Sequence, residues 1–174
     1  MAGRFSPEAV PGANILRWEE TIRQFEAQDA AGTGARGAIL FVGSSSITRW
    51  DLGQYFPGWD VVNRGFGGSL LAEVAVLAGR YVTPPAPRQV ILYAGDNDLA
   101  CGATPAQVLE SYRYFVETVQ AALPSVQIVF LSIKPSPARR HLMPEIREAN
   151  RLVREDARQG KQPGFLDLFT AMLN

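Results

Sequence analysis

Short apolar runs separated by longer amphipathic segments recur along most of this chain. Five of the runs have the length of a strand: 38–43, 59–63, 89–95, 125–133 and, more weakly, 164–169. The first of them, AILFVG, contains no polar side chain, which is typical of a strand covered on both faces. The pattern therefore predicts five strands.

Helical periodicity fills most of the intervals between these runs. The segment 14–28 places four apolar side chains on one helical face, with Asn14 as a candidate N-cap: Ile15, Trp18, Ile22 and Phe25. Two further helices are predicted over 69–79 and 144–158.

The interval between the third and fourth runs has the clearest helix signals. Thr104 is a candidate N-cap, Pro105 fits the first helical position, Gln107 can complete a capping box, and Pro124 ends the helix. The predicted inward face consists of Val108, Tyr112, Phe115, Val116, Val119 and Leu123.

Alternating strands and helices of this kind favour right-handed crossovers and one mostly parallel sheet with helices on both faces. At 174 residues a single domain over 1–174 is expected, with the helical segment 1–30 packed on it.

The composition of the chain excludes several classes of function. Seventeen basic and 17 acidic residues give zero net charge, so no electrostatic footprint for nucleic acid is present. One cysteine, Cys101, and one histidine, His141, can form neither an intrachain disulfide nor a structural zinc site. No stretch reaches the ~20 apolar residues of a membrane span, and a cytoplasmic location is expected, although a mature secreted form would look the same.

In parallel α/β folds, the chemistry lies beyond the carboxyl ends of the strands. Four segments follow the apolar runs: 43–48, 63–69, 94–100 and 132–141. The first, GSSSIT, fits a helix cap and turn, a phosphate cradle or a nucleophilic serine. It lacks the lysine of a P-loop and the G-x-S-x-G spacing of a nucleophile elbow.

The other three segments also leave alternatives open. NRGFGGS is either a glycine-rich turn or a place where Gly68 lets a backbone N–H approach a ligand. In AGDNDLA, the Asn97 amide could donate to an oxyanion, or Asp96 and Asp98 could hold Mg²⁺. His141 is a solvated loop side chain unless its loop folds back over the strand ends.

Taken together and in order, GSSSI, NRGFGG and GDND resemble the SGNH hydrolases, also called the GDSL esterase and lipase family. The resemblance runs from about Ala38 to the end of the chain. It implies that Ser45 is the nucleophile and that Gly68 and Asn97 belong to the oxyanion hole. Ser44 stands where many members have Asp. The segment SIKPSPAR is similar to a subgroup of small bacterial members, in which it is not the catalytic segment.

The resemblance also implies a fold and a reaction. The expected fold is a flavodoxin-like three-layer α/β sandwich whose five parallel strands have the order 2-1-3-4-5. The expected reaction is hydrolysis of a small-molecule carboxylic ester through an acyl-Ser45 intermediate, with no metal and no organic cofactor. The identity of the ester and the oligomeric state are not indicated by the sequence.

The family's catalytic Asp-x-x-His has no counterpart here, and Asp167 matches the family's fifth-strand Asp rather than the catalytic one. Since serine needs a base to be a good nucleophile, three hypotheses follow. The favoured one is that the chain stops before that segment and has little or no activity. The second is a non-catalytic module that binds an anion or acyl group, and the third is His141 as a substitute base.

A further alternative from another class is a Mg²⁺-dependent phosphohydrolase that uses Asp96 and Asp98. This alternative ranks low, because it would make the GSSSI and NRGFGG segments a coincidence.

Overall fold

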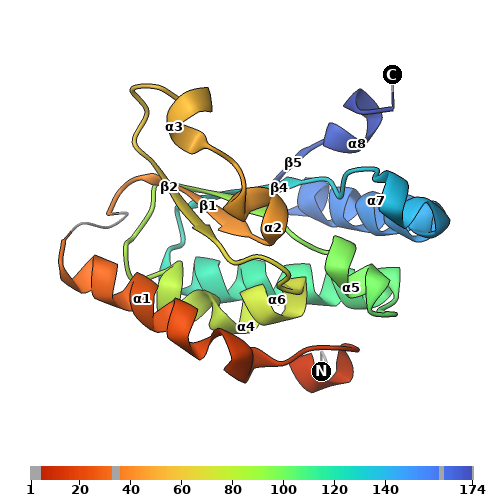
Figure 1. The fold of residues 1–174 in the computed structure, drawn as a ribbon, viewed down its shortest axis with the longest axis horizontal. Helices are drawn as coiled ribbons and strands as arrows, with labels where there is room; N and C mark the ends of the chain where they lie inside the picture. Colours follow the sequence, from red (N-terminus) through yellow and green to blue (C-terminus); the bar gives the residue numbers. More distant parts are fainter. Residues whose placement is uncertain (1–4, 33–35, 161–162, 174) are drawn as a thin grey trace.

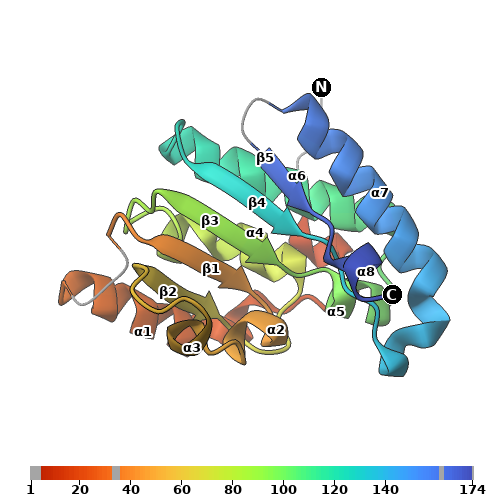
Figure 2. The same ribbon diagram turned by 90° about the horizontal axis from the view of Figure 1, so that it is seen from above.

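A computed structural model describes residues 5–32, 36–160 and 163–173. All five strands form one parallel sheet in the order β2-β1-β3-β4-β5, as predicted (Figures 1 and 2). The strands are β1 (Ile39–Gly43), β2 (Val61–Gly65), β3 (Gln89–Tyr93), β4 (Gln127–Leu131) and β5 (Pro163–Leu166).

Long and short helices lie before, between and after the strands. The long ones are α1 (Glu19–Ala30), α4 (Leu71–Tyr81), α6 (Pro105–Ala122) and α7 (Met143–Gln159). The short ones are α2 (Ser45–Thr48), α3 (Leu52–Tyr55), α5 (Asp96–Ala100) and α8 (Leu168–Ala171), together with the 3-10 segments η1 (Pro7–Ala9), η2 (Ile15–Trp18) and η3 (Pro137–Leu142).

The side chains of the central strands alternate between the two faces of the sheet. One set enters the main core with the long helices; in β1 it consists of Leu40 and Val42. The other set, which includes Ile39 and Phe41, packs with side chains of α2 and α3. Both faces of the central strand are therefore apolar, which is why AILFVG reads as a continuous apolar run.

The two faces are covered unequally. In Figure 1, α1, α4 and α6 lie along one face of the sheet, whereas α2 and α3 lie on the other. On this second face an apolar groove of about 270 Å³ runs over the strands, and Trp59 at its edge is 62% exposed. The short helices thus leave part of the sheet's second face uncovered.

The predicted helix face of α6 is confirmed, since Val108, Tyr112, Phe115 and Val119 are buried. Its capping box is confirmed as well: the Gln107 N–H donates to Thr104 Oγ1, and the Thr104 N–H donates to Gln107 Oε1.

Asn14 does lie at the N-cap position, that of the 3-10 segment η2, but without the side-chain hydrogen bond of an N-cap. The Asn14 side chain makes no cap bond; its backbone N–H donates instead to Glu73 Oε1 at 2.8 Å, and the first turn is the 3-10 segment η2. Glu73 is fully buried in α4, and its Oε2 accepts hydrogen bonds from Trp18 Nε1 and from the Leu70 N–H. The start of α4 therefore anchors the segment before α1.

Strand β2 begins two residues later than predicted and extends two residues further. Its register explains both limits, because Ile39 of β1 pairs with Val61, and Gly43 pairs with Gly65. The neighbouring strand, rather than local composition, sets where β2 begins and ends.

A buried ion pair attaches α1 to the sheet. Arg64 of β2 is fully buried; its Nη2 lies 2.5 Å from Asp29 Oδ1 of α1, and its guanidinium stacks over the ring of Phe25. Removing one partner of such a pair leaves an unpaired buried charge, whereas replacing both with apolar side chains is often tolerated.

We therefore expect Asp29→Ala to lower the free energy of unfolding by about 3–5 kcal/mol. The double variant Asp29→Leu/Arg64→Met should recover most of this loss in urea denaturation. Glu20→Ala, which alters an exposed carboxylate of α1, is the control and should change stability by less than about 0.5 kcal/mol. A double variant as unstable as Asp29→Ala would contradict the assignment.

Candidate active site

The segments singled out by the sequence meet at one edge of the sheet. Figure 2 shows the strands pointing toward the side on which α2, α5 and α8 lie. GSSSIT follows β1, NRGFGGS spans the end of β2 and the turn after it, and AGDNDLA follows β3. Because β1 is paired with both β2 and β3, these three segments become neighbours.

Close backbone contacts fix the position of the serine segment. Gly43 has a φ of +139°, and a Cβ placed there would lie 1.8 Å from the carbonyl oxygen of Tyr93. That carbonyl accepts the N–H of Ser44 at 3.0 Å, which joins the end of β1 to the end of β3. Only glycine fits at position 43, because a side chain would both clash and strain the backbone.

Ser45 is the first residue of α2, and Ser44 precedes it as N-cap. Ser44 is fully buried and its Oγ has no hydrogen-bond partner, whereas Ser45 is partly exposed. The first N–H groups of a helix have no partner within it, so the Ser45 N–H can serve as a donor to a ligand. Of these two serines, Ser45 is the one that a substrate can reach.

The glycine segment after β2 lies against Ser45. A Cβ on Gly67 would lie 3.9 Å from Cα and Cβ of Ser45, so the two backbones are adjacent. Gly68 has a φ of +87°, is exposed, and has no atom within 4 Å of a hypothetical Cβ. Its carbonyl accepts Arg17 Nη2 at 2.8 Å, and the same nitrogen lies 3.0 Å from Glu73 Oε2.

Asn97, in the first turn of α5, is held by two hydrogen bonds. Its Nδ2 donates to the carbonyl of Ser69 at 2.9 Å, and its Oδ1 accepts from Arg139 Nη2 at 2.6 Å. Ser69 directly follows Gly68, so the Asn97 amide lies beside the same glycine segment that lies against Ser45. The structure thus brings Ser45, Gly68 and Asn97 to one place.

The two aspartates beside Asn97 are engaged in protein contacts. Asp98 is fully buried and its carboxylate accepts the N–H groups of Leu71 and Ala72, at 2.8 and 3.4 Å. Asp96 Oδ2 lies 3.8 Å from Arg139 Nε. No group of three or more His, Cys, Asp or Glu side chains that could hold a metal ion occurs in the described parts of the chain.

His141 lies on η3 and is exposed. Within the described ranges it makes no hydrogen bond, ion pair or ring contact, so none joins it to Ser45. The loop after β4 does fold back over the strand ends, but Arg139 rather than His141 reaches the candidate site. The sequence indicated no role for Arg139 or Arg17. Arg17 lies outside the four segments that follow the apolar runs, whereas Arg139 is the last residue of SIKPSPAR, a segment that was not expected to be catalytic.

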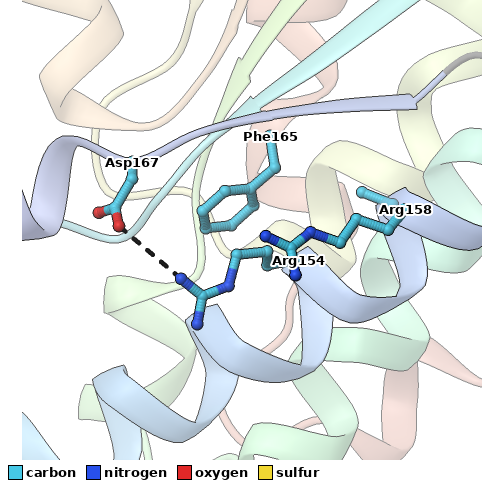
Figure 3. Close-up of a pocket in the computed structure, with 5 residues that line it drawn as sticks. Arg154, Arg158, Phe165 and Asp167 are labelled. Carbon is cyan, nitrogen blue, oxygen red and sulfur yellow. Dashed lines mark ion pairs between the residues drawn. The ribbon is translucent and has the colours of Figure 1, made fainter.

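Another cleft, of about 340 Å³, lies between α7 and the stretch of chain that contains the end of β5 and the residue after it (Figure 3). Arg154 and Arg158 reach into it from α7, and Phe165 and Asp167 line the opposite side. Asp167 also accepts the Thr170 N–H at the start of α8. None of Ser45, Gly68 and Asn97 lines this cleft.

Comparison with known families identifies the chain. The model of the GDSL-like lipase/acylhydrolase family matches residues 27–174. The chain belongs to this family. The match confirms the resemblance to the SGNH hydrolases that the segments GSSSI, NRGFGG and GDND indicated.

Solved structures share the fold at low sequence identity. The structure of a proposed platelet activating factor from Streptococcus pneumonia has a TM-score of 0.78 at 20% identity, covering 90% of this chain and 77% of the other. A GDSL-like lipase from Bacteroides thetaiotaomicron VPI-5482 has a TM-score of 0.69 at 18% identity, with 91% and 80% covered. No curated protein matches the sequence.

A third structure, a carbohydrate esterase family 3 protein from Talaromyces cellulolyticus, has a TM-score of 0.62 at 17% identity, with 77% and 80% covered. In the described residues of the GDSL-family chain, no helix is both long and apolar enough to cross a membrane.

Burial of Asp98 gives the GDSL-family site a pH-dependent stability. Burial raises the pKa of Asp98 from 3.8 to about 6, against the opposing effect of the Leu71 and Ala72 N–H groups. Between these two pH values the folded state binds a proton that the unfolded state does not, so the contribution of Asp98 to stability is full below about pH 4, falls as the pH rises from 4 to 6, and is lost above pH 6.

We expect Asp98→Asn to abolish most of this pH-dependent loss of stability. For a carboxyl whose pKa is about two units higher in the folded state than in the unfolded state, the loss is on the order of 3 kcal/mol. Urea denaturation at intervals from pH 4 to pH 7 measures the slope. Asp51→Asn, at an exposed carboxyl, should leave it in place. An unchanged slope in Asp98→Asn would assign the pH dependence to another group.

Proposed function

We propose that this chain is a serine ester hydrolase in which Ser45 attacks a carboxylic ester. Membership of the GDSL-like lipase/acylhydrolase family supports the reaction class. The observation that carries the assignment of residues is the glycine segment, which lies against Ser45 at Gly67 and against the Asn97 amide at Ser69. One continuous stretch of backbone thereby connects the nucleophile to the amide donor.

The proposed chemistry begins when Ser45 Oγ bonds to the ester carbonyl carbon and loses its proton to a base. The carbonyl electron pair moves to oxygen, and the resulting oxyanion accepts hydrogen bonds from the Ser45 and Gly68 N–H groups and from Asn97 Nδ2. When the tetrahedral intermediate collapses, the protonated base gives its proton to the departing alkoxide, so that the alcohol leaves and acyl-Ser45 remains. Water then attacks the acyl carbon, which releases the acid and regenerates the serine.

The conformation of Gly68 suits the role of an oxyanion donor. A positive φ directs the peptide of Gly68 in a way that a residue with a side chain rarely adopts, and no neighbouring atom occupies the space beside it. The Arg17 guanidinium holds the carbonyl on the other side of the same residue. A substrate oxygen can therefore approach the Gly68 N–H without meeting a Cβ.

The reaction also needs a base that accepts the Ser45 proton. The described residues offer no candidate for this base next to Ser45. The one imidazole of the sequence, His141, is exposed on η3 and makes no contact with Ser45. We infer that these 174 residues carry a nucleophile and an oxyanion hole without an imidazole base. Ester turnover should then be low and should rise when imidazole is added to the buffer, since free imidazole can accept the serine proton.

A fluorophosphonate should label Ser45 covalently, by bonding of Oγ to phosphorus and loss of fluoride. Intact-mass and peptide mass spectrometry should find one adduct, located on Ser45. Ser45→Ala should remove it, whereas Ser46→Ala, which alters the adjacent hydroxyl, should retain it. Imidazole should increase the release of p-nitrophenolate from p-nitrophenyl acetate more with the wild type than with Ser45→Ala.

A negative result in both measurements would refute the hydrolase assignment. The absence of an adduct together with the absence of Ser45-dependent phenolate release would favour a module of the same fold that binds an anion or acyl group without turnover. An adduct on Ser46 would instead identify Ser46 as the nucleophile.

Asn97→Ala should reduce turnover by about 100-fold or more and change KM by less than about threefold, because an oxyanion donor acts in the transition state. Steady-state kinetics in the presence of imidazole, corrected for the Ser45→Ala background, measures both constants. Asn14→Ala, which removes an amide that makes no cap bond, is the control. A change confined to KM would remove Asn97 from the oxyanion hole.

A further inference from the structure

Arg139 reaches the candidate site from the end of the SIKPSPAR segment, which is separate from GSSSI, NRGFGG and GDND. It belongs to η3, in the loop after β4, and its side chain is one-quarter exposed. Its Nη2 donates to Asn97 Oδ1 at 2.6 Å, and its Nη1 donates to the backbone carbonyl of Asp96. The guanidinium thus binds two consecutive residues at the start of α5.

These contacts fix which way round the Asn97 amide lies. A guanidinium only donates hydrogen bonds and a backbone carbonyl only accepts them. The oxygen of the amide must therefore face Arg139, and the nitrogen must face the Ser69 carbonyl, 2.9 Å away. The reverse orientation would place two donors together and two acceptors together.

This orientation leaves one hydrogen of the amide for a substrate. Nδ2 carries two hydrogens, and the carbonyl of Ser69 uses one of them. A positive charge at the amide oxygen also polarises the group, which makes the remaining N–H a stronger donor to an anion.

We propose that Arg139 is a positioning residue of the ester hydrolysis: it holds the Asn97 amide with one N–H free for the oxyanion. This inference rests on the proposed function of Ser45 and Asn97. Arg139 itself does not have to contact the substrate, because its effect passes through Asn97.

The loop that carries Arg139 is held in place by other contacts. Asn150 of α7 donates to the carbonyl of Ile133 at 2.9 Å and accepts the N–H of the same residue at 2.8 Å. Ser132 Oγ accepts the N–H of Phe169 at 2.8 Å. Since these bonds do not involve the guanidinium, the base of the loop should survive its removal.

The neighbouring residue provides a matched control. Arg140 is exposed and makes no hydrogen bond or ion pair in the described residues. Arg140→Met therefore makes the same chemical change as Arg139→Met, one position along the same segment, without touching Asn97. A general effect of net charge or of the loop would appear in both variants.

The experiment is a double-mutant cycle of Arg139 and Asn97. Its readout is the rate constant for fluorophosphonate labelling of Ser45. Intact-mass spectrometry follows the labelling and can also measure slow reactions. Arg139→Met should slow labelling about tenfold in the wild type and less than twofold in the Asn97→Ala background. Arg140→Met should have no effect. Arg139→Lys, which keeps the charge and one donor, should fall between Arg139→Met and the wild type.

Each outcome supports or overturns the proposal. An unchanged rate in Arg139→Met overturns it, and so does an equal slowing with and without Asn97, which would show that Arg139 acts elsewhere. Labelling of Ser45→Ala at the wild-type rate would instead refute the proposed function. If Arg139→Met does not fold, Arg139→Lys carries the same cycle.

A second measurement does not depend on reactivity. In ¹⁵N-labelled protein the Nδ2 hydrogen of Asn97 that is bonded to Ser69 should exchange slowly with solvent, and the two Nδ2 hydrogens should exchange slowly with each other. Arg139→Met should accelerate this exchange, whereas Arg140→Met should not; equal exchange in all three proteins would contradict the positioning role.

Discussion

The candidate site depends on the close approach of β1 to β3 at Gly43. The Ser44 N–H is bonded to the carbonyl of Tyr93 at a point where a Cβ on Gly43 would lie 1.8 Å from that oxygen. Strand β1 is also paired with β2 up to Gly65, so three strands end side by side at this point. The chain leaving each strand then has little freedom in direction, and three segments that are distant in sequence become neighbours.

Parallel pairing alone would bring the segments close without joining them. The additional contacts run across the site: from Gly67 to Ser45, from Ser69 to Asn97, and from Asp98 to the first N–H groups of α4. Most of them use backbone groups or short polar side chains, which have few rotamers to lose. The site is consequently rigid where a substrate would bind, and the long flexible side chains, Arg17 and Arg139, support it from outside.

Much of this could be predicted from the sequence. The five strands follow from apolar runs, α6 follows from its proline and capping box, and the positions of Ser45, Gly68 and Asn97 follow from the order of the motifs. What could not be predicted depends on long-range contacts. Asparagine is a residue type that often caps helices with its side chain. At Asn14, however, it is the backbone N–H that is bound, by a buried carboxylate 59 residues away. Arg139 lies in the SIKPSPAR segment, whose sequence indicates no partner for it, and only the fold shows that it meets Asn97.

The contacts of Glu73 have a consequence for where the site begins along the chain. The family match starts at residue 27, yet the Gly68 carbonyl is bonded to Arg17, which Glu73 holds at the start of α4. A segment outside the range of the family match thereby supports a residue of the candidate site. The range that the family model matches is therefore narrower than the range of residues that holds the candidate site in place.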